Sequence, residues 1–430
     1  MSDANFPGTT PVSPEGDDED GWRTSRAVPV LIVLIAVGLI GAIVLVSRQE
    51  QDAGQQALAA TTMDAAALPA TVPYREVAGH LVIDVTLGDG SRTVPMIIDT
   101  GAPSIVSEEV AEVFGSGSSG TISTASIDGK VFTSEVVTLP LLSIGGVAFT
   151  DVGAVVGSIE PGNPFYCVTD AGFIGASLMQ TGVWRIDPRA GTVTIVATAS
   201  ELPGLEDAVR FDFARASDVS PSPLVELPVG QGTLPVLLDT GSDGWLAVSP
   251  LDLDSVGGIV RTDAPAQEVL ATTFGGVLGS RIAWSSVEVG LGQSGTMPVA
   301  TIDTLPDGQG NAGTDLLRHF IVTLDWSEDV VYLQPPDGAP FPAVPLSATV
   351  AWDDGFVVGS RVLGQPDADV LTLGTPVSAI DGRDVTGAPF DDFCRHVLEG
   401  PATYEMTIGG EVPTTIEVAP VDGFYLPLGG

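Results

Sequence analysis

The chain has 430 residues, with 55 acidic and 16 basic side chains, a formal net charge of −39 and 44% hydrophobic residues. This apolar content is enough for a packed core and excludes wholesale disorder, while the acidic excess disfavours nucleic-acid binding. The 3 histidines and 2 cysteines show neither HExxH nor paired-cysteine spacing, which excludes a zinc site of standard spacing and a disulfide framework. One bridge between Cys167 and Cys394 stays open, and we expect no metal and no other cofactor.

The first predicted element is a membrane anchor. Residues 27–46 form an uncharged apolar run, long enough at about 1.5 Å per residue to cross a bilayer core of about 30 Å. A cleaved signal peptide is the alternative, although its apolar region is usually shorter. Arg23 and Arg26 precede the run and Arg48 follows it, a bias that favours a cytoplasmic N-terminus and an extracellular remainder at the cell membrane.

Two polar segments flank the anchor. Residues 1–26 carry acidic residues, proline and glycine and predict a disordered cytoplasmic tail. Residues 47–73 are rich in Gln, Ala and Thr and predict a linker stalk that carries the next domain away from the membrane.

The chain then repeats itself. LVIDVTLGDGSRTVPMIIDTGAPSIVS (81–107) parallels PLVELPVGQGTLPVLLDTGSDGWLAVS (223–249), and each copy reads as an alternating strand, a Gly-centred turn, a second apolar strand and Asp-Thr-Gly. Two such copies predict a pseudo-dimer around a local two-fold axis. We expect lobe 1 over residues 74–200 and lobe 2 over residues 201–334.

The Asp-Thr-Gly triplets predict the chemistry. Each follows a fully apolar strand end, which directs the carboxylate toward the interior, where an unpaired charge is costly. A two-fold axis would place Asp99 against Asp239, and like charges about 3 Å apart share one proton. One carboxylate can then activate a water molecule while the protonated one polarises a peptide carbonyl, which predicts hydrolysis without a covalent intermediate.

This pattern resembles the aspartic peptidases of the retropepsin and pepsin type over about residues 76–334. The resemblance implies a mainly β, bilobal acid-protease β-barrel pseudo-dimer with Asp99 and Asp239 as the catalytic dyad. In such a site the threonines cross-brace the two loops and the glycines permit the tight turns. The supporting residues of the dyad loops are then Thr100, Gly101, Thr240, Gly241 and Ser242.

The resemblance also implies flap hairpins over the cleft, and the candidate flap residues are Asp128, Gly129, Gly275 and Gly276. The lobes differ after Asp-Thr-Gly, because Ser242 can donate a hydrogen bond to Asp239 whereas Ala102 has no hydroxyl to offer Asp99. Hydrogen bonding to the charged form lowers a carboxyl pKa. We therefore expect Asp239 to carry the charge and Asp99 the shared proton.

A Pro-rich linker over residues 335–345 separates the peptidase from residues 346–430. The turn Ile380-Asp381-Gly382 and the helix-like segment that follows resemble the bacterial, protease-associated PDZ domain. The strand Val357–Val362 is the candidate groove for a peptide bound as an added strand. A small domain packed on the peptidase without a ligand is the alternative.

Together these features predict a single-pass membrane protein that exposes a bilobal aspartic endopeptidase and a small PDZ-like α+β domain. The expected partners are a polypeptide substrate, the lipid bilayer around residues 27–46 and a peptide ligand of the PDZ-like domain. The alternative is a catalytically silent, membrane-tethered peptide-binding or scaffold protein.

Overall fold

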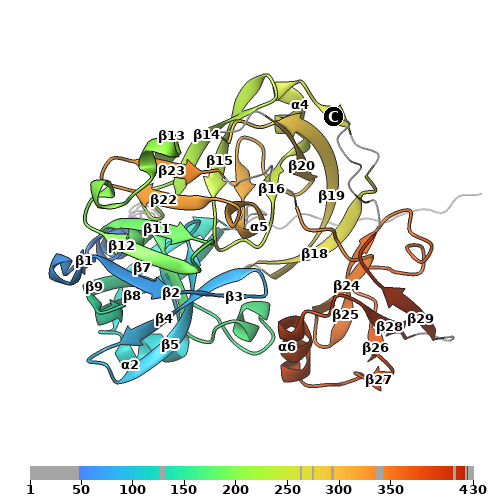
Figure 1. Cartoon of the computed structure of the whole chain (residues 1–430). Helices are drawn as coiled ribbons and strands as arrows, with labels where there is room; N and C mark the ends of the chain where they lie inside the picture. The colour runs from blue at the N-terminus through green and yellow to red at the C-terminus, as the bar shows by residue number, and fades with distance from the viewer. Residues whose placement is uncertain are drawn as a thin grey trace, which may run out of the picture. The chain divides into compact units, whose positions relative to one another are not determined.

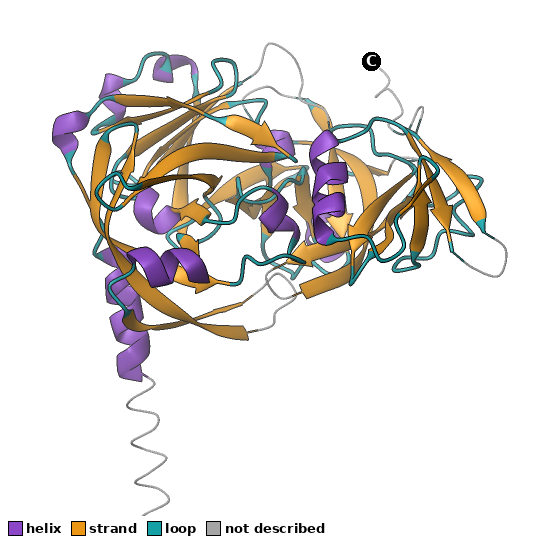
Figure 2. Cartoon of the chain, turned by 90° about the horizontal axis from the view of Figure 1, so that it is seen from below, coloured by secondary structure: helices purple, strands orange, loops and turns teal. Residues whose placement is uncertain are grey.

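The computed structural model describes residues 48–125, 131–261, 264–273, 276–291, 295–335, 342–409, 413–421 and 424. Strands dominate the described chain and the helices are short (Figures 1 and 2), so the mainly β prediction is confirmed. The predicted tail and transmembrane segment, residues 1–26 and 27–46, lie outside the described residues. Within the part of the chain that is described, no helix combines the length and the apolar character needed to cross a membrane.

The two sequence repeats fold into the same succession of elements. The first repeat forms β4 (His80–Leu87), β5 (Arg92–Asp99), β6 (Ile105–Ser107) and α2 (Glu108–Phe114). The second forms β14 (Pro223–Val229), β15 (Gly232–Leu238), β16 (Leu246–Val248) and α4 (Pro250–Val256). Both helices begin in the same way, because the hydroxyls of Ser107 and Ser249 accept the N–H of the residue three positions on, as N-cap residues do.

The repeats continue in parallel beyond these helices. An antiparallel meander follows in each, with β7 (Ser118–Ala125), β8 (Val131–Ile144) and β9 (Val147–Gly157) matching β18 (Gln267–Thr273), β19 (Gly276–Glu288) and β20 (Thr296–Ile302). Each repeat then closes with a strand and a helical turn, namely β10 (Gly172–Gly175) and α3 (Ala176–Met179), or β21 (Gly310–Ala312) and α5 (Thr314–Leu317). β10 runs parallel to β5 and antiparallel to β6, and β21 has the same relation to β15 and β16.

The two halves share one sheet in the order β2-β12-β11-β22-β23-β13. The first half contributes β2 (Ala70–Pro73), β11 (Val183–Asp187) and β12 (Thr192–Val196), and the second contributes β13 (Val209–Arg215), β22 (Ile321–Asp325) and β23 (Val330–Gln334). β11 and β22 pair antiparallel at the centre, with Trp184 opposite Leu324, and both side chains are buried in the main core. The order is symmetric about this central pair, because each strand of the first half has its counterpart of the second half at the same distance from the centre. This is the pairing expected around a local two-fold axis.

The stalk predicted over residues 47–73 requires a correction. Residues 48–59 are helical and Leu58 is buried, β1 (Thr62–Met63) pairs with β9, and β2 pairs with β12. The alanine-rich composition that indicated a spacer instead allows close packing, with the backbone of Ala57 lying against Gly153. The remaining short elements are η1 (Ala65–Ala67), β3 (Arg75–Val77), η2 (Pro164–Cys167), η3 (Ala199–Glu201), η4 (Leu205–Asp207) and β17 (Val260–Arg261).

The C-terminal residues pack around a second core. They form β24 (Ala348–Trp352), β25 (Phe356–Val362), β26 (Val377–Ile380), β27 (Arg383–Asp384), α6 (Phe390–Glu399), β28 (Tyr404–Ile408) and β29 (Thr414–Val418). The expected Asp-Gly turn is present, since Asp381 and Gly382 both have positive φ values, 49° and 73°. β26 to β29 make a separate four-stranded sheet in the order β27-β26-β28-β29.

The strand Val357–Val362, predicted as a peptide-binding groove, is part of β25 and lies between β18 and β24. β18 pairs with its residues 360–362, and Val358 exchanges two backbone hydrogen bonds with Gly374 and Thr375. The salt bridge between Arg361 and Glu268 reinforces the junction at 2.6 Å. The groove prediction is therefore wrong for this strand, because the protein's own β18 occupies the edge that a peptide would need.

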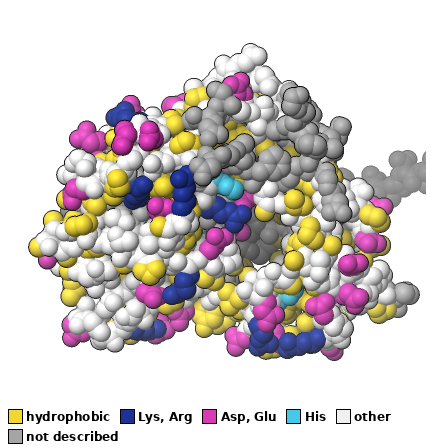
Figure 3. Space-filling model, viewed as in Figure 1, with side chains coloured by type: hydrophobic (Ala, Val, Ile, Leu, Met, Phe, Trp, Pro, Cys, Tyr) yellow, Lys and Arg dark blue, Asp and Glu magenta, His cyan; other side chains and the backbone are white. Residues whose placement is uncertain are grey.

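Charged side chains lie over the surface, where small basic groups are separated by acidic and uncharged side chains (Figure 3). Some of them join segments that are distant in the sequence. Arg318 pairs with Glu76 at 3.0 Å and with Asp315 at 2.6 Å, so it links the second half to the first. Such partly exposed pairs contribute at most about 1 kcal/mol each, so they add less to the junction of the halves than the shared sheet does.

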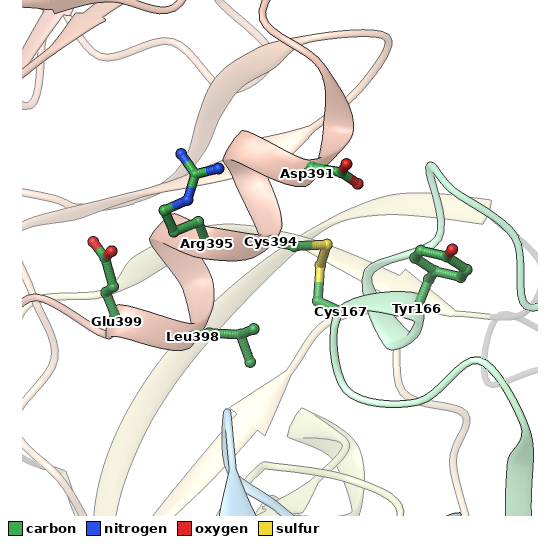
Figure 4. A pocket seen from close by; sticks show the side chains of 7 residues that line it. All are labelled: Tyr166, Cys167, Asp391, Cys394, Arg395, Leu398 and Glu399. Atoms are coloured by element: carbon green, nitrogen blue, oxygen red, sulfur yellow. A yellow bond between two sulfur atoms is a disulfide. The ribbon is translucent and has the colours of Figure 1, made fainter. Parts of the chain in front are cut away.

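Cys167 and Cys394 form a disulfide, which answers the question that the sequence left open. The bond joins η2 of the first half to α6 of the C-terminal segment, beside a pocket lined by Tyr166 and by side chains of α6 (Figure 4). The C-terminal segment is thus held to the first half covalently and to the second half by the pairing of β18 with β25.

Removing the disulfide should lower the free energy of unfolding by about 2–4 kcal/mol. The bond closes a separation of 227 residues, and a bond across a long loop restricts the unfolded chain most. The measurement is guanidinium unfolding of a variant with Cys167→Ser and Cys394→Ser against the wild type, with reduced wild type as the control. Equal unfolding midpoints for all three samples would contradict the prediction.

Candidate active site

The two Asp-Thr-Gly loops meet where β5 and β15 end. The last three residues before each aspartate, 96–98 and 236–238, are buried apolar side chains, so each strand delivers its aspartate to the interior. Asp99 is only 6% exposed, whereas Asp239 keeps more contact with solvent. A buried pair with one accessible member can act on a molecule that enters from solvent.

The two threonines brace the loops against each other. The Thr100 hydroxyl donates to the Leu238 carbonyl at 2.6 Å, and the Thr240 hydroxyl donates to the Ile98 carbonyl at 2.8 Å. In return, the backbone N–H of Thr100 donates to the Thr240 hydroxyl at 3.1 Å, and that of Thr240 donates to the Thr100 hydroxyl at 3.0 Å. These buried and reciprocal bonds connect loops 140 residues apart, which is the cross-brace that the resemblance implies.

The two glycines let the carboxyl groups approach. A Cβ at Gly101 would collide with the carboxyl group of Asp239, and a Cβ at Gly241 would collide with that of Asp99. Neither glycine has a positive φ, so a tight left-handed turn is not the reason for glycine here. The prediction that these glycines permit a tight turn therefore needs correction. Glycine is required because the opposite carboxyl group lies too close to leave room for a side chain.

The two carboxyl groups interact electrostatically. Burial raises the pKa of Asp99 well above its usual value, and the charge of Asp239 raises it further. Burial also raises the pKa of Asp239, but the hydrogen bonds that this carboxylate accepts oppose the rise. Each carboxyl group therefore has its pKa raised mainly by burial, and the two groups are coupled by charge and by a hydrogen bond between them, so the pair titrates as one unit.

Residues 83–178 match the model of the aspartyl protease family. The match contains Asp99 and the elements from β5 to β10, and Asp239 lies outside it. Among curated proteins none matches the sequence. The crystal structure of the aspartic proteinase from Irpex lacteus is similar with a TM-score of 0.39 and 13% identity, over 63% of this chain and 98% of that chain.

The match to the aspartyl protease family supports an aspartic peptidase. The matched region contains one aspartate of the pair, and the second half contains the other. Its Asp-Thr-Gly loop provides the partner carboxyl group in the same geometry. Among the described residues, no cluster of three or more His, Cys, Asp or Glu is arranged to hold a metal ion. The candidate flap residues Asp128, Gly129 and Gly275 lie outside the described residues, and Gly276 begins β19.

The donors around Asp239 differ from those expected. Ser242 donates its backbone N–H to Oδ1 of Asp239 at 3.2 Å, while its hydroxyl accepts the N–H of Gly244 at 3.3 Å. Among the hydrogen bonds of the described residues, none joins the Ser242 hydroxyl to Asp239, so the predicted hydroxyl donor is wrong and the backbone N–H of this residue contacts the carboxylate instead. The side-chain donor is Asn311, whose Nδ2 lies 2.7 Å from Oδ2 of Asp239.

Sequence reasoning missed Asn311. It lies in β21, the short strand that runs beside the second Asp-Thr-Gly loop. The available signal was a polar residue at the position where the first half has Phe173. A polar residue in a strand that lies beside the loop of a buried aspartate needs a partner, and here the carboxylate provides one.

Proposed function

We propose that the protein is a membrane-anchored aspartic endopeptidase that hydrolyses peptide bonds of polypeptide substrates through a water molecule activated by Asp99 and Asp239. The observation that carries the proposal is the close approach of these carboxyl groups across Gly101 and Gly241. A carboxyl pair that holds one proton offers a base and an acid at the same place. The family match of residues 83–178 supports the same class of chemistry.

In the proposed mechanism, ionised Asp239 takes a proton from water as the water oxygen attacks the peptide carbonyl carbon. The proton of Asp99 passes to the carbonyl oxygen, which gives a tetrahedral diol. Asp239 then returns its proton to the peptide nitrogen while Asp99 takes one from a diol hydroxyl, and the carbon–nitrogen bond breaks. The products are a carboxylic acid and an amine, and the pair regains its single proton in the original place.

The proposed location is the cell membrane, with residues 27–46 as the anchor and the peptidase on the outer side. The uncharged apolar run supports the anchor. The disulfide between Cys167 and Cys394 supports an oxidising compartment for the folded part, since disulfides rarely persist in the cytosol. Membrane fractionation before and after alkaline washing tests the anchor, and full release into the soluble fraction would contradict it.

The test of activity is incubation of the full chain with a mixed peptide library from pH 3 to pH 7.5. Mass spectra should show new internal cleavage sites, and reactions in ¹⁸O-labelled water should place one label in the new carboxyl group. Cleavage only at chain ends would contradict an endopeptidase. Absence of cleavage at every pH would favour a silent binding protein.

A further inference from the structure

The inference concerns the asymmetry of the carboxyl pair and rests on the proposed function. The two Asp-Thr-Gly loops offer equivalent backbone donors. Gly101 donates its N–H to Oδ1 of Asp99 at 2.9 Å, and Gly241 donates to Oδ1 of Asp239 at 3.0 Å. The next residue in each loop, Ala102 or Ser242, adds a second backbone N–H. These backbone donors therefore do not explain why one carboxyl group is ionised in preference to the other.

The neighbouring strands do break the symmetry. Asn311 lies opposite Leu237 in the parallel pair of β21 and β15, and Phe173 lies opposite Ile97 in the parallel pair of β10 and β5. The two residues occupy the same place in their halves. The amide of Asn311 donates to Oδ2 of Asp239 at 2.7 Å, whereas the Phe173 ring has no donor and is buried against Phe165 with ring centroids 5.2 Å apart.

We propose that Asn311 is a positioning residue that selects Asp239 as the ionised base of the pair and leaves the proton on Asp99. An ionised carboxylate accepts hydrogen bonds only, so an amide N–H at 2.7 Å favours that state over the protonated one. The amide also fixes the plane of the Asp239 carboxylate, because Oδ1 is held at the same time by the loop N–H groups. The base therefore faces the substrate in one defined orientation.

The first arm of the test is the pH dependence of kcat/KM for the full chain carrying Asn311→Leu. Leucine has a similar size but no donor, so the acidic limb should move to higher pH by about one unit. Asn311→Asp keeps the shape and replaces the amide by a third carboxyl group at the site, so it should move the limb further in the same direction. Asp212→Asn is the control, and its limb should stay in place because this carboxyl group is exposed on β13, pairs with Arg210 and belongs to neither Asp-Thr-Gly loop.

The second arm needs no activity. It compares the melting temperatures of the wild type and Asn311→Leu from pH 3 to pH 8. Stabilisation of ionised Asp239 is present only above the pKa of that group, so the advantage of the wild type should be largest near neutral pH and should shrink as the pH falls. A residue that only fills space would give the same difference at every pH.

The two arms separate this inference from the proposed function. An active wild type whose acidic limb is unchanged by Asn311→Leu, with only a uniform loss of rate, overturns the role of Asn311. A wild type that cleaves nothing overturns the proposed function, and the melting curves then decide about Asn311 alone. A pH-dependent difference in melting temperature supports the hydrogen bond to an ionised carboxylate, and a constant difference overturns it.

Discussion

Replacing either Asp99 or Asp239 by asparagine should reduce peptide cleavage by about 10²–10⁴-fold, because each substitution removes one of the two groups that carry the proton. The amide has the shape of the carboxyl group, so the loops keep their cross-brace and the variants should fold. The measurement is the initial rate of cleavage of a single peptide chosen from the library. Asp212→Asn is the matched control, since that carboxyl group is exposed on β13 and pairs with Arg210.

The same variants make a prediction about stability. The pKa of Asp99 is raised in the folded protein, so the folded state binds this proton more tightly than the unfolded state does. The stability that this proton provides is therefore lost as the pH rises from 3.8, the ordinary pKa of an aspartate, through the higher pKa of folded Asp99, and the loss is complete above that pKa. Asp99→Asn should be more stable than the wild type near neutral pH and should converge with it in acid.

Urea unfolding at several pH values measures this difference. An advantage of Asp99→Asn that is equal at all pH values would contradict the raised pKa of Asp99. Loss of cleavage together with a gain in neutral stability would show that the pair is kept for its chemistry at a cost to the fold, as is common for functional groups that are buried and ionisable.

The second large effect is expected at the cross-brace. Thr240→Val keeps the shape of the side chain but removes the hydroxyl that donates to Ile98 and accepts from Thr100. Both backbone groups are left buried without these partners, which should cost about 3 kcal/mol of unfolding free energy. Cleavage should fall by roughly 100-fold, the effect of displacing a reacting group by about 1 Å.

Thr240→Ser is the matched control for this change. It keeps the hydroxyl and loses only the methyl group, so it should retain most of the stability and most of the activity. Thr100→Val should behave like Thr240→Val, because the bonds are reciprocal. Valine and serine variants of equal stability would show that the hydroxyl bonds do not hold the two loops together.

The repeated Asp-Thr-Gly loops could be predicted from the sequence because their signals are local. An apolar strand end, an aspartate and a glycine stand next to one another, and the repetition indicates the two-fold relation that brings Asp99 to Asp239. The succession of strands in each half follows from the same alternating pattern. These features depend on short stretches of chain, so they can be recognised in the sequence alone.

The features that were missed depend on contacts between distant segments. Asn311 reaches Asp239 across 72 residues through a parallel strand pair, and no short pattern indicates that pairing. The disulfide spans 227 residues, and its partners carry no spacing signal. The stalk was misassigned for a related reason, since residues 70–73 become a strand only through pairing with β12.

The pairing of β18 with β25 has a consequence for any shortened form of the protein. If the chain ended before Leu346, residues 267–269 would lose their strand partner and expose a row of backbone N–H and C=O groups. Such an open edge is a template for another strand, so it invites self-association between molecules. The C-terminal segment therefore also covers this edge and prevents it from pairing with a strand of another molecule.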